Sequence, residues 1–120
     1  MVRTGSTDPN VRALVNALRK ASTKNDARVW KRVAELVSRP TRQRAVVNLG
    51  KIERHSNDGD VIVVPGKVLG AGVLTHKVVV AALSASASAR ATIVAAGGSL
   101  ITIDELVTRV PKGSGVTIIT

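Results

Sequence analysis

The core of this chain has to be built from aliphatic side chains, because Trp30 is its only Phe, Tyr or Trp residue. Hydrophobic residues make up 44% of the 120 residues, and most of them are Val, Ala, Leu or Ile. β-Branched side chains such as Val and Ile pack well in strands, so this composition favours a fold that contains a β-sheet. A chain of this length buries about two-thirds of the surface of its unfolded form. We therefore expect a single domain over residues 1–120 with an aliphatic core.

The spacing of apolar residues predicts two helices near the N-terminus, after a loose arm at residues 1–7. Asp8 suits the N-cap of the first helix, and Pro9 suits its first turn. Residues 23–26 break the apolar pattern and suit the cap of a second helix. That helix should end before Pro40, because the residue before a proline avoids the α region.

Short strands and short helices are expected to alternate through the rest of the chain. The predicted strands cover residues 45–47, 61–64, 77–83 and 116–119. Short helices are predicted after Asn48 and Thr102, and over residues 84–96, where Gly97 and Gly98 suit a glycine C-cap. The glycine-rich residues 65–72 are predicted to form a loop. The fold class is therefore mixed, with N-terminal helices before the strands.

Positive charge is concentrated in the N-terminal half. The chain has 18 Lys and Arg residues against 8 acids, a net charge of +10. Thirteen of these cations lie in residues 1–60 and five in residues 61–120. This asymmetry predicts a basic, helix-rich part at residues 8–60 and an apolar mixed α/β core at residues 61–120. Nucleic acid is the first partner that such a charge indicates, and an anionic membrane surface is the second.

Cysteine is absent, which excludes disulfides, thiolate catalysis and cysteine-based zinc sites. The two longest uncharged runs, residues 78–89 and 91–103, are separated by Arg90. Each is shorter than the roughly 20 apolar residues that a spanning helix needs. The N-terminus has no apolar stretch typical of a signal peptide. We expect a cytoplasmic protein without a membrane partner.

The segment Arg39–Arg54 is the strongest functional signal. Its cationic side chains, including one titratable histidine, are Arg39, Arg42, Arg44, Lys51, Arg54 and His55. Glu53 is the one acid that opposes them. Such a cluster repels itself unless an anion lies against it, and guanidinium groups grip phosphate oxygens bidentately. A solvated basic loop without a partner is the alternative, but the stiffening by Pro40 and the sequence pI of about 11.4 favour nucleic acid.

The composition also indicates how the nucleic acid would be bound. Proteins that read single strands stack bases on aromatic rings, whereas Trp30 lies on the predicted apolar face of its helix. Contacts to phosphates and sugars of a folded RNA or a duplex fit better. Lys67 is a second predicted contact point. A basic flank on the two helices is predicted from Arg12, Arg19, Arg28, Lys31 and Arg32.

No motif for catalysis or for a cofactor is complete. Pro65-Gly66-Lys67 fails as a phosphate-binding loop, because Val68 stands where Ser or Thr is needed. The segment 70–72 fails the dinucleotide pattern, because Thr75 occupies the place of the third glycine. His55 and His76 have no acid at a recognisable spacing. We predict no enzyme activity, metal, cofactor or small-molecule substrate. The glycines are explained by tight turns, or by a bare backbone at residues 66–72 that, with Lys67, approaches an RNA backbone.

Several segments in series resemble a known family. They are Val29-Trp30-Lys31-Arg32-Val33-Ala34, Arg39-Pro40-Thr41-Arg42, residues 47–52, residues 63–72 and Pro111-Lys112-Gly113-Ser114-Gly115-Val116. In order and spacing they are similar to the large-subunit ribosomal protein of the archaeal and eukaryotic type, the eighteenth in that series, a relative of the fifteenth bacterial one. The chain departs from the family at two places. Thr41 stands where the family often has a basic residue, and Ala85-Ser86 stands where it often has an aromatic residue.

The resemblance implies an α+β fold, in which the N-terminal helices precede an irregular β-β-α superhelical core of short strands and helices. It implies a structural constituent of the large ribosomal subunit that binds the large rRNA and neighbouring ribosomal proteins, with the Arg39–Arg44 loop and the glycine-rich loop facing RNA. Two alternatives stay open. The charges also suit a free-standing nucleic-acid-binding or chromosomal protein, and Pro65-Gly66-Lys67 prompts a small phosphotransfer or nucleotide-binding enzyme.

Overall fold

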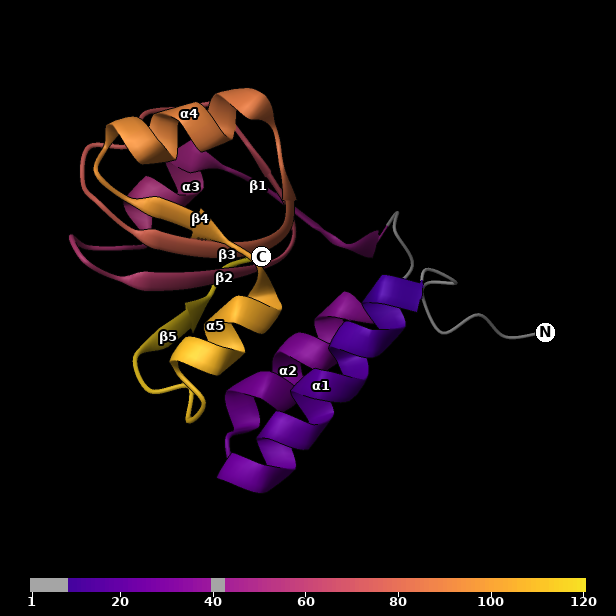
Figure 1. Ribbon diagram of the computed structural model, residues 1–120. Helices are drawn as coiled ribbons and strands as arrows, with labels where there is room; N and C mark the ends of the chain where they lie inside the picture. Colours follow the sequence, from indigo (N-terminus) through magenta and orange to yellow (C-terminus); the bar gives the residue numbers. More distant parts are fainter. Residues whose placement is uncertain (1–8, 40–42) are drawn as a thin grey trace. The chain divides into compact units, whose positions relative to one another are not determined.

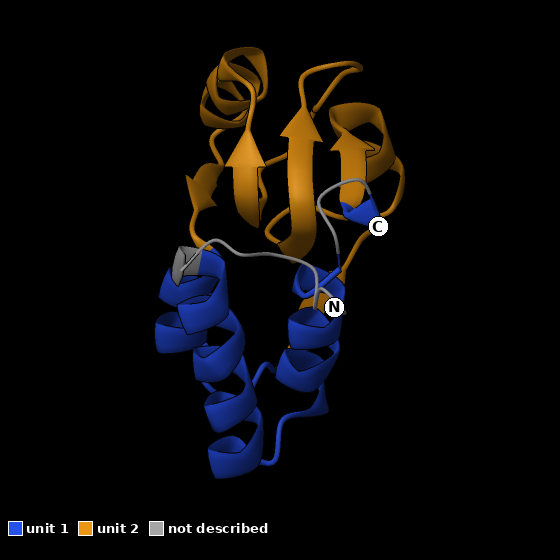
Figure 2. Ribbon diagram, turned by 90° about the vertical axis from the view of Figure 1, so that its right-hand side faces the viewer, with its two compact units in different colours: residues 1–44, 103–114 blue, residues 45–102, 115–120 orange. Residues whose placement is uncertain are grey.

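The computed structural model describes residues 9–39 and 43–120, which form two compact units. Unit 1 comprises residues 1–44 and 103–114, and unit 2 comprises residues 45–102 and 115–120 (Figure 2). The predicted arm at residues 1–7 and the predicted capping role of Asp8 lie outside the described residues.

Unit 1 is helical. Its helices are α1 (Pro9–Asn25), α2 (Arg28–Val37) and α5 (Ile103–Arg109), and α1 packs alongside both others (Figure 1). Leu18 of α1 and Trp30 of α2 are fully buried. The indole Nε1 of Trp30 donates a hydrogen bond of 2.7 Å to the carbonyl oxygen of Pro111. The single aromatic residue therefore anchors the segment after α5 to α2, in the core position that its apolar stripe predicted.

The junction of α1 and α2 differs from the prediction at residues 23–26. Helix α1 continues through Asn25, and polar side chains in its last turns bond back to carbonyls of the same helix. Thr23 Oγ1 donates to Arg19 O at 3.2 Å, and Asn25 Nδ2 donates to Ala21 O at 3.0 Å. The N-cap of α2 is Ala27, which offers no side-chain cap. These polar residues thus end the first helix and leave the second uncapped.

Unit 2 is a parallel sheet covered by two helices. Its strands are β1 (Ala45–Asn48), β2 (Val61–Leu69), β3 (Val79–Ala85), β4 (Ser99–Ile101) and β5 (Val116–Ile118). They lie in the order β1-β2-β3-β4, and β5 also pairs with β2. Helices α3 (Leu49–Arg54) and α4 (Ala87–Ala95) lie on one face of the sheet (Figure 1). The predicted class of N-terminal helices followed by an α+β core of short elements is confirmed.

The core of unit 2 is aliphatic, as the composition predicted. The strands contribute mainly valines and isoleucines, such as Ile62 and Val80, and the helices add Ile52 and Ile93. Helix α4 ends at two glycines. Gly97 has a φ of 85°, and the amides of Gly97 and Gly98 donate to the carbonyls of Val94 and Ile93, each at 3.0 Å. This pattern of bonds is the glycine C-cap that was predicted.

The boundary between the units lies at residue 44, whereas the sequence suggested a division near residue 60. Residues 45–48 belong to the sheet because β1 pairs with the second half of β2, with Ala45 opposite Gly66 and Asn48 opposite Leu69. The segment 103–114 groups with the N-terminal helices instead. Pairing between distant segments, which local patterns do not encode, sets this boundary. That residues 1–120 act as one domain stays a prediction.

The predicted glycine-rich loop at residues 65–72 is wrong over its first half, because β2 continues through Leu69. Pro65 has no N–H to donate, and the register between β2 and β3 shifts between Val64 and Lys67. A bulge at this point lets the strand pass the proline and continue. Gly66 then lies so close to β1 that a Cβ there would overlap the carbonyl oxygen of Ala45.

Replacing Gly66 with alanine is expected to destabilise the fold by about 2–3 kcal/mol, because the new methyl group meets backbone that cannot move aside. The control is Gly59→Ala, where a Cβ meets nothing within 4 Å and only the φ of 84° opposes the side chain, at about 1 kcal/mol. Urea unfolding followed by far-UV circular dichroism measures both. Equal losses in the two variants would contradict the close approach of β1 and β2.

Candidate nucleic-acid interface

The two N-terminal helices present most of the exposed cations of unit 1. On α2, Arg28, Lys31 and Arg32 are exposed on the face opposite Trp30, Val33 and Val37. On α1, Arg12 and Arg19 are exposed on one stripe, separated by seven residues, or about two helical turns. Lys20 and Lys24, which were not among the predicted contacts, are exposed on the adjoining stripe. Helical periodicity, applied to every cation of α1, would have included them.

Few of these cations have an acidic partner among the described residues of the unit. Unit 1 contains thirteen of the eighteen cations but five of the eight acids. Among its described residues, Arg32 pairs with Glu35 at 3.3 Å and Arg109 pairs with Glu105 at 3.8 Å. The other exposed cations of α1 and α2 are left without a carboxylate within the described part. Their charge is therefore available to an external anion.

The cluster at residues 39–44 is not a uniform row of free cations. Arg39 is exposed, and Arg42 lies outside the described residues. Arg44 is half-buried, and its Nε donates a 3.1 Å hydrogen bond to the carbonyl oxygen of Val37, the last residue of α2. A guanidinium at this place satisfies a free helix carbonyl and complements the negative end of the helix dipole. Its buried Nη2 has no hydrogen-bond partner among the described residues.

In unit 2 the predicted contact residues have different surroundings. Lys51 is partly buried, and its Nζ donates to the carbonyl oxygen of Thr120. Arg54 is exposed at the end of α3, and Lys67 is exposed on β2. Lys67 lies between Val46 of β1 and Ser84 of β3, all three on the sheet face away from α3 and α4. Arg54 and Lys67 are thus accessible, whereas Lys51 is partly engaged within the unit.

The glycines after β2 are explained by contacts within the protein. A Cβ on Gly70 would overlap the hydroxyl of Ser88, and one on Gly72, whose φ is 97°, would lie 2.6 Å from the amide nitrogen of Gly50. The turn interpretation is therefore confirmed at Gly72. The residues that stay exposed run from Ala71 to Val73, and Val73 is 66% exposed.

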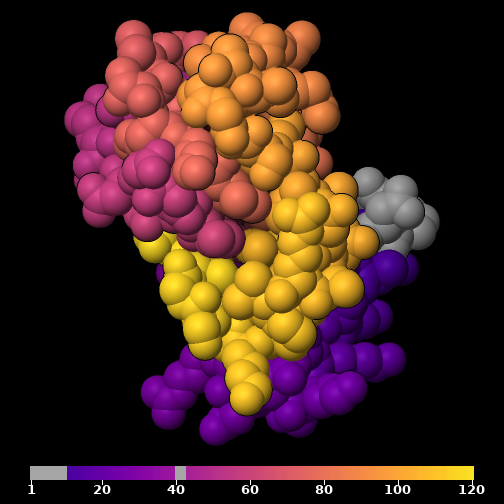
Figure 3. All heavy atoms as spheres, turned by 60° about the vertical axis from the view of Figure 1, so that its left-hand side comes forward, coloured from indigo at the N-terminus to yellow at the C-terminus, as the bar shows by residue number. Residues whose placement is uncertain are grey.

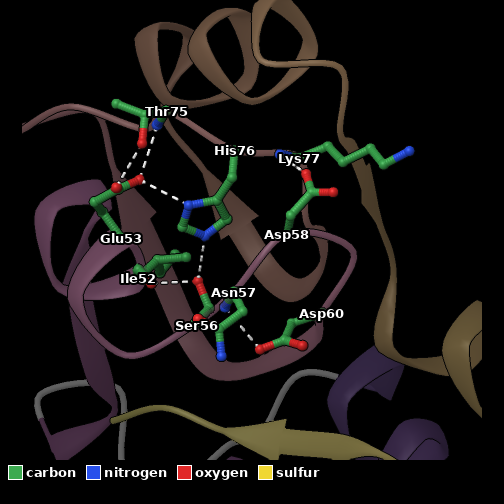
Figure 4. Close-up of polar contacts among 9 residues, drawn as sticks. All are labelled: Ile52, Glu53, Ser56, Asn57, Asp58, Asp60, Thr75, His76 and Lys77. Carbon is green, nitrogen blue, oxygen red and sulfur yellow. Dashed lines mark hydrogen bonds and ion pairs between the residues drawn. The ribbon is translucent and has the colours of Figure 1, made fainter.

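A polar network joins α3 to the segment that follows β2, and it is absent from the sequence-based prediction (Figure 4). Nδ1 of His76 lies 3.1 Å from Oε1 of Glu53, and its Nε2 lies 2.8 Å from Oγ of Ser56. The sequence shows no acid at a recognisable spacing from His76, and the fold places Glu53 beside it. Twenty-three residues separate Glu53 from His76, so only the tertiary fold brings them together.

Glu53 is held ionised by its neighbours. The hydroxyl of Thr75 donates to Oε2 at 2.6 Å, and the amide of Thr75 donates to Oε1 at 2.8 Å. These two bonds, helped by His76, lower the pKa of Glu53 below its ordinary value. The acid that was expected to offset the basic cluster is instead committed to Thr75 and His76.

Other kinds of site find no support in the described part of the chain. The residues described include no group of three or more His, Cys, Asp or Glu side chains that could hold a metal ion. Helices long and apolar enough to cross a membrane are likewise absent from residues 9–39 and 43–120. Trp30 is fully buried, so it offers no platform for stacking a base.

Comparison with known proteins identifies the family. The family of ribosomal proteins 60S L18 and 50S L18e matches residues 2–120. The chain belongs to this family. It is 48% identical to the large ribosomal subunit protein eL18 of Pyrobaculum aerophilum over 116 residues, which cover 97% of this chain and 95% of that protein. The eL18 protein of Methanococcus maripaludis is 48% identical over 113 residues, which cover 94% of each chain.

Membership of the family confirms the resemblance deduced from the sequence. The relatives named above are archaeal, as is Archaeoglobus fulgidus, whose eL18 protein is 49% identical over 109 residues. A family of structural ribosomal proteins also confirms the prediction that the chain is not an enzyme. The nucleotide-binding alternative is thereby removed.

Replacing Glu53 with glutamine is expected to lower stability at neutral pH and to have little effect in acid. A carboxylate whose pKa is lowered by folding stabilises the protein above the pKa of the unfolded chain, and this stabilisation is lost as the pH falls through the folded value. Urea unfolding of wild type and variant from neutral pH to about pH 3 measures the difference. Glu35→Gln, at a carboxylate paired only with Arg32, is the control. A difference between Glu53→Gln and wild type that does not change with pH would contradict this role.

Proposed function

We propose that this chain is a structural constituent of the large ribosomal subunit that binds and stabilises the large rRNA through its exposed cations. The observation that supports this most is the pattern of charge pairing. On α1 and α2, Arg12, Arg19, Arg28 and Lys31 are exposed, and no carboxylate of the described residues pairs with them. Phosphates of a folded RNA would supply the missing negative charge. Contacts to phosphates do not require an aromatic side chain on which a base could stack.

The proposed mechanism is neutralisation of RNA phosphates by cations that project from packed helices. RNA helices that approach one another repel through their phosphates, and fixed cations between them lower that repulsion. Helices α1 and α2 carry their cations on the faces opposite their packed aliphatic sides, so little backbone order has to be gained on binding. Arg39, Arg54 and Lys67 are exposed and are proposed as further contacts.

Two of the residues predicted as contacts have a different proposed role. Arg44 and Lys51 each donate to a carbonyl oxygen within their own unit, Arg44 to Val37 and Lys51 to Thr120. We therefore assign them mainly to local structure. Neighbouring large-subunit proteins remain proposed partners, and the relation to the fifteenth bacterial large-subunit protein stays a prediction.

Removing cations from α1 and α2 is expected to weaken rRNA binding and its dependence on salt. If about six cations contact phosphates, the logarithm of the binding constant should fall with the logarithm of salt concentration at a slope of about −5. Arg12→Gln, Arg19→Gln and Arg28→Gln combined should make this slope shallower by about 2–3 units. Filter binding of large-subunit rRNA between about 50 and 200 mM salt measures the slope.

The matched control is the double variant Arg32→Gln and Glu35→Gln, which removes an internal ion pair on α2 and leaves the net charge unchanged. It should keep the wild-type slope within about 0.5 units. An unchanged slope in the triple variant, with far-UV circular dichroism showing that it is folded, would remove the helical face from the proposal.

A free-standing nucleic-acid-binding or chromosomal protein is the second candidate, and the same charges motivate it. Cosedimentation separates the two functions. A ribosomal constituent stays with the large subunit at high magnesium, whereas a chromosomal protein sediments with DNA and leaves the ribosomal particles.

A further inference from the structure

Helix α3 and the turn after it fasten the segment 70–77 at three successive points. The amide of Gly50 donates to the carbonyl of Ala71 at 3.1 Å. Glu53 then accepts the two bonds from Thr75, and Ser56 meets His76 (Figure 4). The surfaces of α3 with its turn and of the segment after β2 lie side by side in Figure 3. These contacts fix the position of the exposed residues 71–73.

The contact between Ser56 and His76 depends on which atoms carry hydrogens. The hydroxyl of Ser56 has one hydrogen to donate. Its Oγ lies 2.5 Å from the carbonyl oxygen of Ile52, which can only accept a hydrogen bond. With that hydrogen used, Nε2 of His76 has to donate to Ser56 Oγ at 2.8 Å. Nδ1 faces a carboxylate oxygen of Glu53 at 3.1 Å, and that oxygen is also an acceptor. All three contacts are supplied with a hydrogen when both ring nitrogens are protonated.

Either neutral tautomer leaves one contact without a hydrogen. With the proton on Nδ1, Ser56 has to serve both Nε2 and Ile52 with a single hydrogen. With the proton on Nε2, the lone pair of Nδ1 faces the carboxylate of Glu53. Only the imidazolium form supplies a hydrogen to each of the three contacts, so deprotonation of His76 weakens the fastening.

We propose that doubly protonated His76 is a positioning residue that holds the segment 70–77 on α3. The segment is therefore held less firmly as the pH rises. The segment does not bind through His76 itself, whose side chain is 16% exposed. It presents the exposed residues 71–73 together with Lys77 and Arg54. The consequence for RNA rests on the proposed function, whereas the fastening is a property of the free protein.

The other charged groups around this network are already engaged or exposed. Asp58 Oδ1 accepts from the amide of Lys77 at 3.2 Å, and Asp60 Oδ2 accepts from the amide of Asn57 at 2.8 Å. Arg54, His55 and Lys77 are exposed. Glu53 is thus the carboxylate that contacts the imidazole, and the described residues place no other ion pair on His76.

Hydrogen exchange of the Thr75 amide tests the fastening directly, because that amide bonds to Glu53. After correction for the intrinsic rate, its protection in the wild type should fall about three- to tenfold between about pH 5.5 and 8, where imidazole groups lose their charge. His76→Gln should show lower protection without this fall. His55→Gln, which changes the exposed neighbouring histidine, is the matched control and should follow the wild type.

A Ser56→Ala variant distinguishes the network from a simple ion pair. Without the serine hydroxyl, the neutral tautomer with a proton on Nδ1 satisfies Glu53 and nothing else demands a hydrogen. Its pH-dependent loss of Thr75 protection should therefore be less than half that of the wild type. A flat profile in the wild type, or a full wild-type profile in Ser56→Ala, would overturn the proposal.

Binding of large-subunit rRNA over the same pH range is the second measurement. To remove the exposed His55 from the comparison, both proteins carry His55→Gln, and the one that keeps His76 should lose about threefold more affinity than the one with His76→Gln between about pH 5.5 and 8. Equal losses in the two proteins, with the exchange result intact, would overturn the role of the segment in presenting RNA contacts. Absence of rRNA binding at every pH would instead reject the proposed function and leave the exchange result standing.

Discussion

Repulsion among eighteen cations, opposed by eight acids, works against every compact state of this chain. The acids of unit 2 do little to relieve it. Glu53 is committed to Thr75 and His76, and Asp58 and Asp60 accept bonds from backbone amides. The carboxylates of this unit therefore stabilise local backbone structure, and they do not neutralise its exposed lysines and arginines. The proposed RNA partner would supply the missing negative charge.

The fold withstands this repulsion through close packing of aliphatic side chains and backbone. With one aromatic residue available, unit 2 fills its core with valine, isoleucine, leucine and alanine between a parallel sheet and two helices. Glycines let backbone segments meet where any side chain would interfere, as at Gly66 against β1 and Gly72 against α3. A close-packed framework of this kind fixes the backbone from which the exposed side chains project.

Much of this structure follows from local patterns, and the remainder depends on tertiary contacts. The faces of α1 and α2, the burial of Trp30 and the glycine cap of α4 were all predictable, because helical periodicity and cap residues act over a few positions. The extension of β2 past Pro65 was not, because pairing on both sides of the strand overrides the proline signal. The same limit applies to the candidate site. Exposed cations such as Arg28 were predictable, whereas the bonds of Arg44 to α2 and of His76 to Glu53 arise only in the fold.

We propose that exposed cations, unpaired within the described residues, meet RNA phosphates in the large ribosomal subunit. A density map of the large subunit from the source organism would show these contacts. We expect this chain in the particle, with the guanidinium groups of Arg12, Arg19 and Arg28 within about 3 Å of rRNA phosphate oxygens. A particle that lacks the chain, or a map in which these side chains face solvent, would contradict it.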